Sequence, residues 1–309
     1  MQYLTHCYLT IPLRALSSSL TKVTPTIQPV KSCQILTQGQ YSKHFSTKPK
    51  FDNDPSAYRS LRSTMDAKLK SRLNRQQRFQ SIREREDRCD MPVEMCKANS
   101  VGRYMTIYRG CNLICSPEDY VLYHQLLWYV RPHTVIELGT CEGGSAVWFA
   151  DQLKLLNIPG HVYSMDIDSS LLSEAVKKLN PDNVTFLQGD CNVIEKTFTP
   201  ELLTKLPHPW VVIDDSHVNL DGTLSYFHQY LKEGDYLVVE DTNPYIPLNV
   251  APIASVLDSC PLLGPEKLEA LKAFLHKYDE YYAVDSFLTD FFGYNCSWMW
   301  HGFVRRMKT

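Results

Sequence analysis

Three features are missing from this sequence of 309 residues: a long apolar run, closely paired cysteines and a strong net charge. No apolar run approaches the ~18 residues that span a bilayer, so we expect no transmembrane segment. None of the ten cysteines stands in a Cys-x-x-Cys pair, and Cys111 and Cys115 are the closest two. This argues against a disulfide scaffold or zinc ribbon and favours a reducing compartment. The net charge of -2 gives no reason to expect a nucleic-acid partner.

Acidic residues are entirely absent from residues 1–50, which carry one arginine, five lysines and many Ser and Thr. This composition is typical of an organelle transit peptide. We therefore expect mitochondrial import of the chain. The alternative is a disordered leader on a cytoplasmic protein.

Residues 51–104 form a charged extension ahead of the main domain. Between residues 56 and 90 there are ten Lys/Arg against five Asp/Glu, with an apolar residue at every fourth position from Leu61 to Leu73. This spacing predicts a helix with a narrow apolar stripe. We interpret it as a solvent-exposed helix packing one edge on the main domain; contact with an acidic partner or a membrane is the functional alternative.

The main domain is predicted to span residues 105–309, where short apolar runs alternate with helical patterns. A helix over 117–130 begins with Ser116 as its cap and Pro117 at its first position. Strands are expected at 134–138, 161–166, 184–188, 210–214 and 236–240, with helices near 145–157, 169–179, 193–205 and 221–232. The alternation predicts a doubly wound, mostly parallel α/β sheet with ligands at the carboxyl ends of its strands.

Neither a G-x-G-x-x-G fingerprint nor a Walker A motif is present, which argues against dinucleotide and P-loop nucleotide sites. Instead, the first strand ends at Glu137 and leads through Gly139 and Gly143 into a helix. Asp166 ends the second strand, and Asp190 follows the third. This order of elements resembles a class I S-adenosylmethionine-dependent methyltransferase with a Rossmann-like fold.

Two acidic pairs end the fourth and fifth strands: Asp214 with Asp215, and Glu240 with Asp241. Adjacent parallel strands lie ~4.8 Å apart, so these carboxylates converge on one small volume. Carboxylates packed together repel unless a cation neutralises them, and oxygen ligands suit Mg²⁺, Mn²⁺ or Ca²⁺. We therefore expect a divalent-metal site; solvated carboxylates that cap helices are the alternative.

His217 lies three residues after Asp214. An imidazole titrates near neutrality, so it can accept the proton of an acceptor hydroxyl bound to the same metal. We predict His217 as the catalytic base. An ordinary hydrogen-bonding histidine in a surface loop is the alternative.

Several segments resemble the cephalosporin hydroxylase / rhamnosyl O-methyltransferase family. They are "RPHTVIELGTCEGGSAVWFAD", "VYSMDID", "VVIDDSH", "LKEGDYLVVEDTN" and the ending "YNCSWMWHGFVRR". The resemblance covers about residues 105–306 and is most specific at the two acidic strand ends.

This resemblance implies an S-adenosylmethionine site and a divalent metal, Mg²⁺ or another. The implied metal ligands are Asp214, Glu240 and Asp241. The cofactor would be bound by the loop and strand-end residues Glu137, Gly139, Cys141, Gly143, Ser145, Asp166 (ribose) and Asp190 (adenine). The arrangement is also similar to that of catechol O-methyltransferase, where a lysine occupies the position three residues after the first metal-binding aspartate. His217 stands at that position in this chain, which is in line with its predicted role as the base.

The sequence departs from the family pattern at Cys141, where a glycine is usual, and at Tyr108 and Cys115, where Trp and Lys are usual. These departures bear on the cofactor loop and on the acceptor side. The C-terminal aromatic residues Tyr294, Trp298 and Trp300 could line an acceptor pocket, although core or hairpin packing is the simpler interpretation.

The resulting hypothesis is metal-assisted O-methylation of a small-molecule hydroxyl on a sugar, polyketide, phenol or lipid headgroup, with a link to lipid biosynthesis. The alternatives are a hydroxylase, as the family name suggests, methyl transfer without metal, and a non-catalytic cofactor-binding or assembly protein. Both a monomer and a homo-oligomer are compatible with the sequence.

Overall fold

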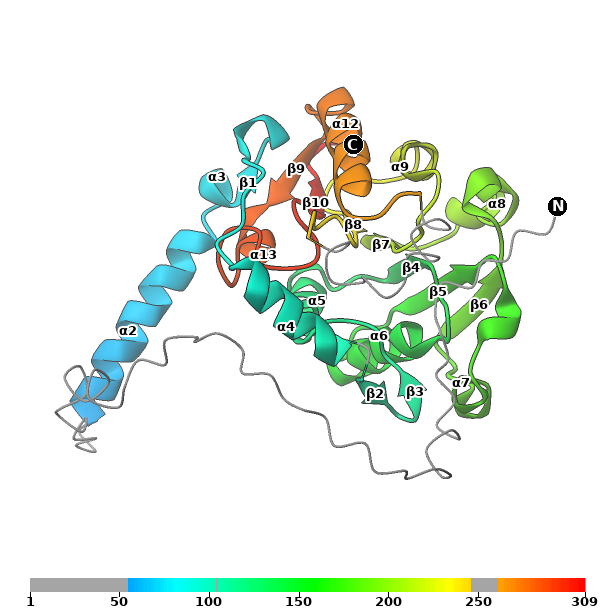
Figure 1. Cartoon of the computed structure of the whole chain (residues 1–309), viewed down its shortest axis with the longest axis horizontal. Coiled ribbons are helices and arrows are strands. Elements are labelled where there is room, and N and C mark those ends of the chain that lie inside the picture. Colours follow the sequence, from blue (N-terminus) through cyan, green and yellow to red (C-terminus); the bar gives the residue numbers. More distant parts are fainter. Residues whose placement is uncertain (1–54, 104, 246–260, 309) are drawn as a thin grey trace, which may run out of the picture. The chain divides into compact units, whose positions relative to one another are not determined.

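The computed structural model describes residues 55–103, 105–245 and 261–308 (Figure 1). The described part of the chain divides into two compact units between Lys70 and Ser71. The predicted leader at residues 1–50 lies outside the described residues.

The larger unit is built on an eight-stranded sheet with the order β1-β9-β10-β8-β7-β4-β5-β6 (Figure 1). Strands β4 to β8 run parallel, whereas β10, β9 and β1 join the edge beyond β8 by antiparallel pairing. The predicted mostly parallel, doubly wound α/β fold is therefore confirmed. The strands are β1 (Phe79–Gln80), β4 (Thr134–Leu138), β5 (His161–Asp166), β6 (Val184–Gln188), β7 (Trp210–Asp214), β8 (Tyr236–Val239), β9 (Tyr282–Asp285) and β10 (Phe303–Arg306). A separate hairpin pairs β2 (Ile107–Tyr108) with β3 (Cys111–Asn112).

The parallel strands follow the sequence prediction closely. Strands β4, β5, β6 and β7 have the predicted bounds, and β8 ends one residue before the predicted Glu240. Every residue of β4 and β7 is buried. Their apolar runs are the signature of central strands that are covered on both faces.

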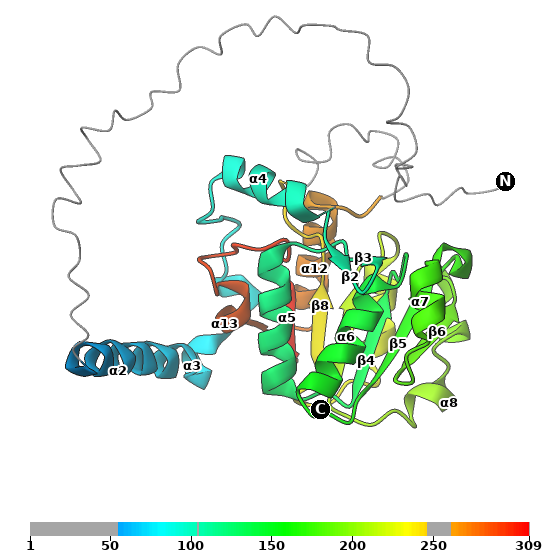
Figure 2. The same cartoon turned by 90° about the horizontal axis from the view of Figure 1, so that it is seen from below.

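Helices cover both faces of the sheet (Figure 1). On one face α5 (Pro117–Val130) and α6 (Gly144–Leu155) supply Leu122, Leu126 and Phe149 to a core; Figure 2 shows these two helices in front of the sheet. On the other face α9 (Leu220–His228) and α12 (Pro265–Lys277) supply Phe227 and Phe274 to a second core. This is the layered arrangement that buries a parallel sheet.

Two predicted helices are broken in the structure. The stretch 169–179 divides into η2 (Ser169–Leu171) and α7 (Glu174–Leu179), because Ser173 caps a new start by accepting a hydrogen bond from Val176 N. Likewise 193–205 divides into η3 (Cys191–Lys196) and α8 (Pro200–Leu203), where Thr199 is the cap. A capping side chain satisfies free N–H groups and so begins a helix where it stands.

The part of the chain just before the predicted main domain contributes to the sheet. Residues from Ser71 onward belong to the same compact unit as the sheet, because β1 pairs with β9 through Gln80 and Val284. The short helices α3 (Arg75–Arg78) and η1 (Ile82–Glu84) flank β1, and α4 (Val93–Arg103) follows them. Buried ion pairs from Arg78 to Asp285 and from Arg85 to Asp290 fasten this segment to the C-terminal part of the chain, which includes α13 (Ser286–Thr289).

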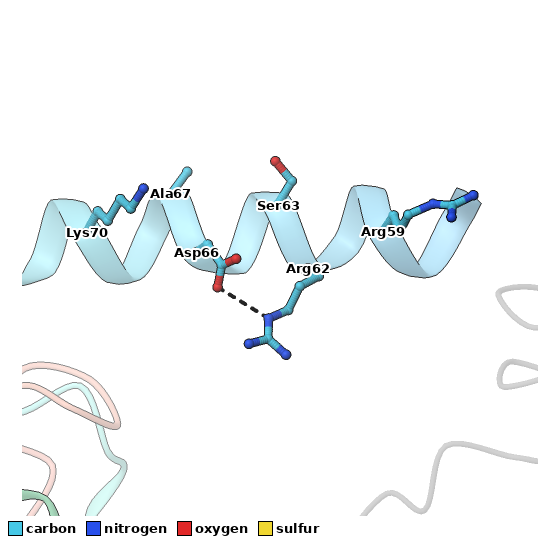
Figure 3. A pocket seen from close by; sticks show the side chains of 6 residues that line it. All are labelled: Arg59, Arg62, Ser63, Asp66, Ala67 and Lys70. Carbon is cyan, nitrogen blue, oxygen red and sulfur yellow. Dashed lines mark hydrogen bonds and ion pairs between the residues drawn. The ribbon is translucent and has the colours of Figure 1, made fainter. Parts of the chain in front are cut away.

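The helix predicted from the apolar stripe is observed as α2 (Pro55–Arg72). Its stripe residues Leu61, Met65 and Leu69 are exposed. Four charged side chains of the same helix, Arg59, Arg62, Asp66 and Lys70, line a pocket together with Ser63 and Ala67, and Arg62 forms an ion pair with Asp66 (Figure 3). This is a solvated, highly charged helix surface. Within the described residues, no helix has the length and apolarity required to cross a membrane.

Candidate active site

The parallel strands place their following loops at one edge of the sheet, and every predicted site residue lies in or beside these loops. The loop after β4 is held to β5 by a hydrogen bond from Gly139 N to Met165 O of 2.9 Å. It is held to the loop after β7 by a bond from Asp215 N to Leu138 O, also 2.9 Å. The predicted cofactor turn and the acidic cluster are therefore neighbours.

The glycines of the turn are required by its geometry. Gly139 has a φ of 106°, and a Cβ there would lie 2.8 Å from Asp215 O. Gly143 has a φ of 86°, and a Cβ there would lie 2.9 Å from the Leu172 side chain. Only glycine adopts these angles at little cost and fits the space.

Cys141, in the middle of this turn, also has a positive φ of 47°. Its backbone N–H donates to Asp166 Oδ2 at 2.7 Å, which ties the turn to the end of β5. The second Asp166 oxygen accepts from Asp168 N at 3.1 Å. A carboxylate oxygen can accept more than one hydrogen bond, so Asp166 retains free lone pairs, and its predicted contact with the ribose stays a prediction.

Glu137 lies underneath the turn. It is buried and accepts a hydrogen bond from the Ser164 hydroxyl, which in turn contacts Thr140 Oγ1 at 2.6 Å. Burial raises the pKa of Glu137 to about 7, and Ser145 and Ser164 partly offset this. The structure thus gives Glu137 and Ser145 a role in holding the turn together.

Asp190, after β6, caps η3. Its Oδ1 accepts from Asn192 N at 2.8 Å and from Asn192 Nδ2 at 2.9 Å. Asp190 is half-buried at the same edge of the sheet as Asp166. Its predicted position near the adenine stays a prediction.

Asp214 differs from its predicted environment. Its carboxylate is fully buried and forms an ion pair with Lys267 of α12, with Oδ1 and Nζ 3.1 Å apart. Ser216 Oγ donates to both of its oxygens, at 3.2 and 3.3 Å. Asp214 therefore already has a cation and a hydroxyl as partners.

Glu240 is also engaged by the protein. The phenol of Tyr123, on α5, donates a hydrogen bond to Glu240 Oε1. Burial, together with the neighbouring Asp241, raises the pKa of Glu240. The arrangement favours a carboxyl group held by a phenol over a freely solvated ligand.

Asp241 pairs with an arginine from outside the predicted main domain. Arg103 Nη1 lies 3.0 Å from Asp241 Oδ1, and its guanidinium is 4.3 Å from the centroid of the Trp298 ring. Burial favours the protonated carboxyl, but Arg103 and the nearby His217 and Lys267 outweigh it and lower the pKa of Asp241. Trp298 and Trp300 are buried, which supports the packing interpretation of these two aromatic residues.

A different group converges on one point: ligand atoms of Asp215, His217 and Asp241 all lie within 4.8 Å of one another. Only Asp241 belongs both to this group and to the predicted metal set. Asp215 Oδ1 is buried and has no hydrogen-bond partner among the described residues. An unpartnered buried carboxylate oxygen is costly unless a cation or a proton joins it, and burial accordingly raises the pKa of Asp215 well above its usual value. These residues fit a divalent cation.

His217 presents one ring nitrogen to this group. Nδ1 lies 3.2 Å from Leu262 O, so it carries the proton, and Nε2 lies 3.9 Å from Asp241 Oδ2. Burial, with a contribution from Lys267, lowers the pKa of His217 to about 4. The imidazole is therefore neutral at pH 7, with a free lone pair on Nε2.

Lys267, Arg103 and Tyr123 were not predicted from the sequence as members of the site. Lys267 and Arg103 stand in charged helical stretches with no motif around them, and Tyr123 lies within an apolar helix pattern. The only feature of the sequence that pointed to such residues was the two acidic pairs. Buried carboxylates require partners, so cations and hydroxyls from elsewhere in the chain were to be expected near them.

Comparison with known proteins identifies the family of the chain. The sequence profile of the rhamnosyl O-methyltransferase/CmcI family matches residues 101–307. The chain belongs to this family. The predicted resemblance and the predicted methyltransferase class are thereby confirmed.

Individual relatives and solved structures show the same similarity. The rhamnosyl O-methyltransferase of Mycobacterium bovis (strain BCG / Pasteur 1173P2) is 30% identical over 195 residues, which cover 61% of this chain and 74% of the relative. That of Mycobacterium leprae is 27% identical over 187 residues, covering 58% and 75%. The apo-structure of CmcI is 28% identical with a TM-score of 0.52, covering 67% of this chain and 78% of that one. CmcI with Mg-SAM is 28% identical with a TM-score of 0.50, covering 66% and 77%.

Proposed function

We propose that this protein transfers the methyl group of S-adenosylmethionine to a hydroxyl of a small-molecule acceptor, with a divalent cation, Mg²⁺ in the first instance, at the acidic cluster. The observation that carries the proposal is the short distance between the cofactor turn and the acidic cluster. A Cβ on Gly139 of the cofactor turn would meet Asp215 O, the backbone of a cation-site residue, at 2.8 Å. Donor and acceptor bound at such neighbouring positions would be held in attack geometry, which supplies much of the rate.

The cofactor side is assigned to the turn after β4 and to Asp166. The backbone of Gly139, Cys141 and Gly143 can approach the cofactor closely, and Asp166 has lone pairs left for the ribose hydroxyls. Glu137 keeps the turn in shape from below through Ser164. Support for the cofactor comes from the CmcI relative, which has been solved with Mg-SAM.

The cation side is assigned to Asp215 and Asp241, whose carboxylate oxygens can hold Mg²⁺ while waters complete its coordination. A bound divalent cation lowers the pKa of a hydroxyl that it coordinates. His217 Nε2, unprotonated at neutral pH, lies beside Asp241 and can take the hydroxyl proton. Arg103 holds Asp241 charged and in place.

We propose a sugar as the acceptor class, on the strength of the relatives named rhamnosyl O-methyltransferase. A hydroxylase is less well supported. A non-haem iron oxygenase of the facial-triad type uses two histidines and one carboxylate, whereas the cluster found among the described residues holds one histidine and two carboxylates.

Calorimetric titration of S-adenosylmethionine with and without Mg²⁺, followed by methyl transfer to rhamnosides with the free hydroxyls of the sugar intact, tests the proposal. We expect cofactor binding to the wild type and turnover that is lost in excess chelator. Asp66→Asn on the exposed α2 is the matched control and leaves both unchanged. Absence of cofactor binding contradicts the enzyme assignment, and full activity in excess chelator contradicts the cation.

A further inference from the structure

Lys267 is the third residue of α12, and its side chain is completely buried. An ammonium group taken out of water is expensive unless charges and hydrogen bonds compensate for it. Among the described residues, its hydrogen-bond and ion-pair partners belong to Asp214 and Ser216, and none belongs to the cofactor turn. The position of this cation therefore requires an explanation.

The three donors of the ammonium group are all used at the end of β7. Nζ lies 3.1 Å from Asp214 Oδ1, 3.1 Å from Asp214 O and 2.6 Å from Ser216 O. An ammonium group has three N–H donors, so its hydrogen bonding is complete. Lys267 holds both the side chain of Asp214 and the turn that carries Asp215 and His217.

The chain just before Lys267 braces the same region. Leu262 N donates to His217 O at 3.1 Å, and Gly264 N donates to Asp241 O at 2.8 Å. The segment 262–267 thus contacts both acidic strand ends. Its contacts fix the positions of Asp215, His217 and Asp241 relative to one another.

Three of the four acidic residues at the two strand ends have a partner within the protein. Lys267 neutralises Asp214, Arg103 pairs with Asp241, and Tyr123 donates to Glu240. Asp215 alone among the four acids keeps a buried oxygen without a hydrogen-bond partner in the described part of the chain. A divalent cation entering the cluster would therefore find its opening at Asp215 and Asp241.

We propose that Lys267 is a resident cation of the active site: it removes Asp214 from the divalent-cation site and positions Asp215 and His217 toward Asp241. Lys267 is a positioning residue in this scheme. The proposal deepens the proposed function and rests on it for the chemical role of the cluster.

Binding of Mn²⁺, followed by electron paramagnetic resonance, separates Asp214 from Asp215. We expect Asp215→Asn to lower Mn²⁺ affinity at least tenfold. The double variant Asp214→Asn with Lys267→Met removes the ion pair as a whole, and we expect it to keep Mn²⁺ affinity within about threefold of the wild type. The proposal is overturned if the folded double variant loses Mn²⁺ as Asp215→Asn does, or if the wild type binds none.

Thermal unfolding provides a second test, that of the ion pair between Lys267 and Asp214. Lys267→Met alone leaves Asp214 buried without its cation, so its melting temperature is expected to fall by roughly 10 °C, and the double variant recovers a large part of the loss. Lys272→Met on the same helix is the matched control, because the Lys272 ammonium pairs with Asp87 near the surface. We expect it to shift the melting temperature by at most about 3 °C. Equal effects of the single and double variants contradict the pairing.

The proposed function can fail separately. Cofactor titration and methyl transfer report on it, whereas Mn²⁺ affinity and melting temperature report on Lys267. Dependence of Mn²⁺ binding on Asp215 and not on Asp214 supports the positioning role even in a protein that transfers no methyl group.

Discussion

At position 141 the backbone takes a left-handed conformation that glycine adopts more easily than any other residue. Cys141 has a φ of 47° in the turn that the proposed cofactor would contact. Such a conformation costs a non-glycine residue about 1–2 kcal/mol. A residue other than glycine therefore adds strain in the middle of this turn.

We predict that Cys141→Gly raises the free energy of unfolding by up to about 1 kcal/mol, because relief of strain exceeds the entropy that glycine adds to the unfolded chain. Chemical denaturation measures this. Cys141→Ala keeps the strain and removes the thiol, so it should bring no gain. An equal gain in both variants would assign the effect to the thiol.

The His217 imidazole is held by Leu262 O with its free nitrogen facing the acidic cluster. We predict that His217→Gln lowers kcat by roughly 10²–10⁴-fold, as loss of a general base does, and leaves the affinity for S-adenosylmethionine unchanged. His276→Gln, at an exposed position of α12, is the control. A kcat within tenfold of the wild type would exclude His217 as the base.

Among the elements, the short β1 joins the N-terminal extension to the sheet. Arg78, next to β1, donates from Nε and Nη2 to both carboxylate oxygens of Asp285, at 2.8 and 2.6 Å. The two side chains are 10% and 0% exposed, so water screens their attraction little. This ion pair and the strand pairing make residues 71–103 a structural part of the catalytic unit.

We predict that Arg78→Met lowers the free energy of unfolding by about 3–5 kcal/mol, because it leaves the buried Asp285 without its cation. Denaturant unfolding measures the loss. Arg75→Met, three residues earlier in α3, removes an exposed pair with Glu233 and should cost less than about 1 kcal/mol. A similar small cost for both variants would show that β1 is held by strand pairing alone.

At the same scale, prediction from sequence succeeded for the central strands and failed at the sheet edge. The apolar runs at 134–138 and 210–214 are buried on both faces, so local composition identifies them. The pairing of β1 with β9 is two residues long and joins segments about 200 residues apart, and no local pattern encodes it. The predicted helix 169–179 was broken because the cap at Ser173 outweighed the continuous helical pattern.

For the whole molecule, acid stability depends on buried histidines. His301 is completely buried between Arg85 and Asp87; burial, aided by Arg85, lowers its pKa from 6.5 to about 4. The unfolded chain binds the proton first, so this stability is complete above pH 6.5 and is lost as the pH falls toward 4.

We predict that the free energy of unfolding falls by up to about 3 kcal/mol on this account between pH 6.5 and 4. His301→Gln keeps both hydrogen bonds without a titrating group, so its loss should be smaller by that amount. Denaturant unfolding at the two pH values compares them. Identical losses in the two proteins would rule out His301.

The destination of the chain is a further property of the molecule as a whole. We propose mitochondrial import directed by residues 1–50, because they are acid-free and weakly basic. A fluorescent protein fused after residue 50 should enter mitochondria. Replacing Arg14 and the five lysines by glutamine should keep it in the cytoplasm, and a diffuse signal from the unaltered leader would contradict the proposal.

The sequence by itself determined the five parallel strands between residues 134 and 240, and with them the edge at which Gly139, Asp166, Asp215 and Asp241 gather. Hydrophobic periodicity is a local property, and parallel strands bring their carboxyl ends to one edge. Only the tertiary structure decided which cation or hydroxyl pairs with each acidic residue at the strand ends. Lys267 stands 53 residues after Asp214 and Arg103 stands 138 before Asp241, and no spacing rule connects them. Asp214, Asp241 and Glu240 are matched by Lys267, Arg103 and Tyr123, which the folded chain brings within reach, because an unmatched charge is costly to bury.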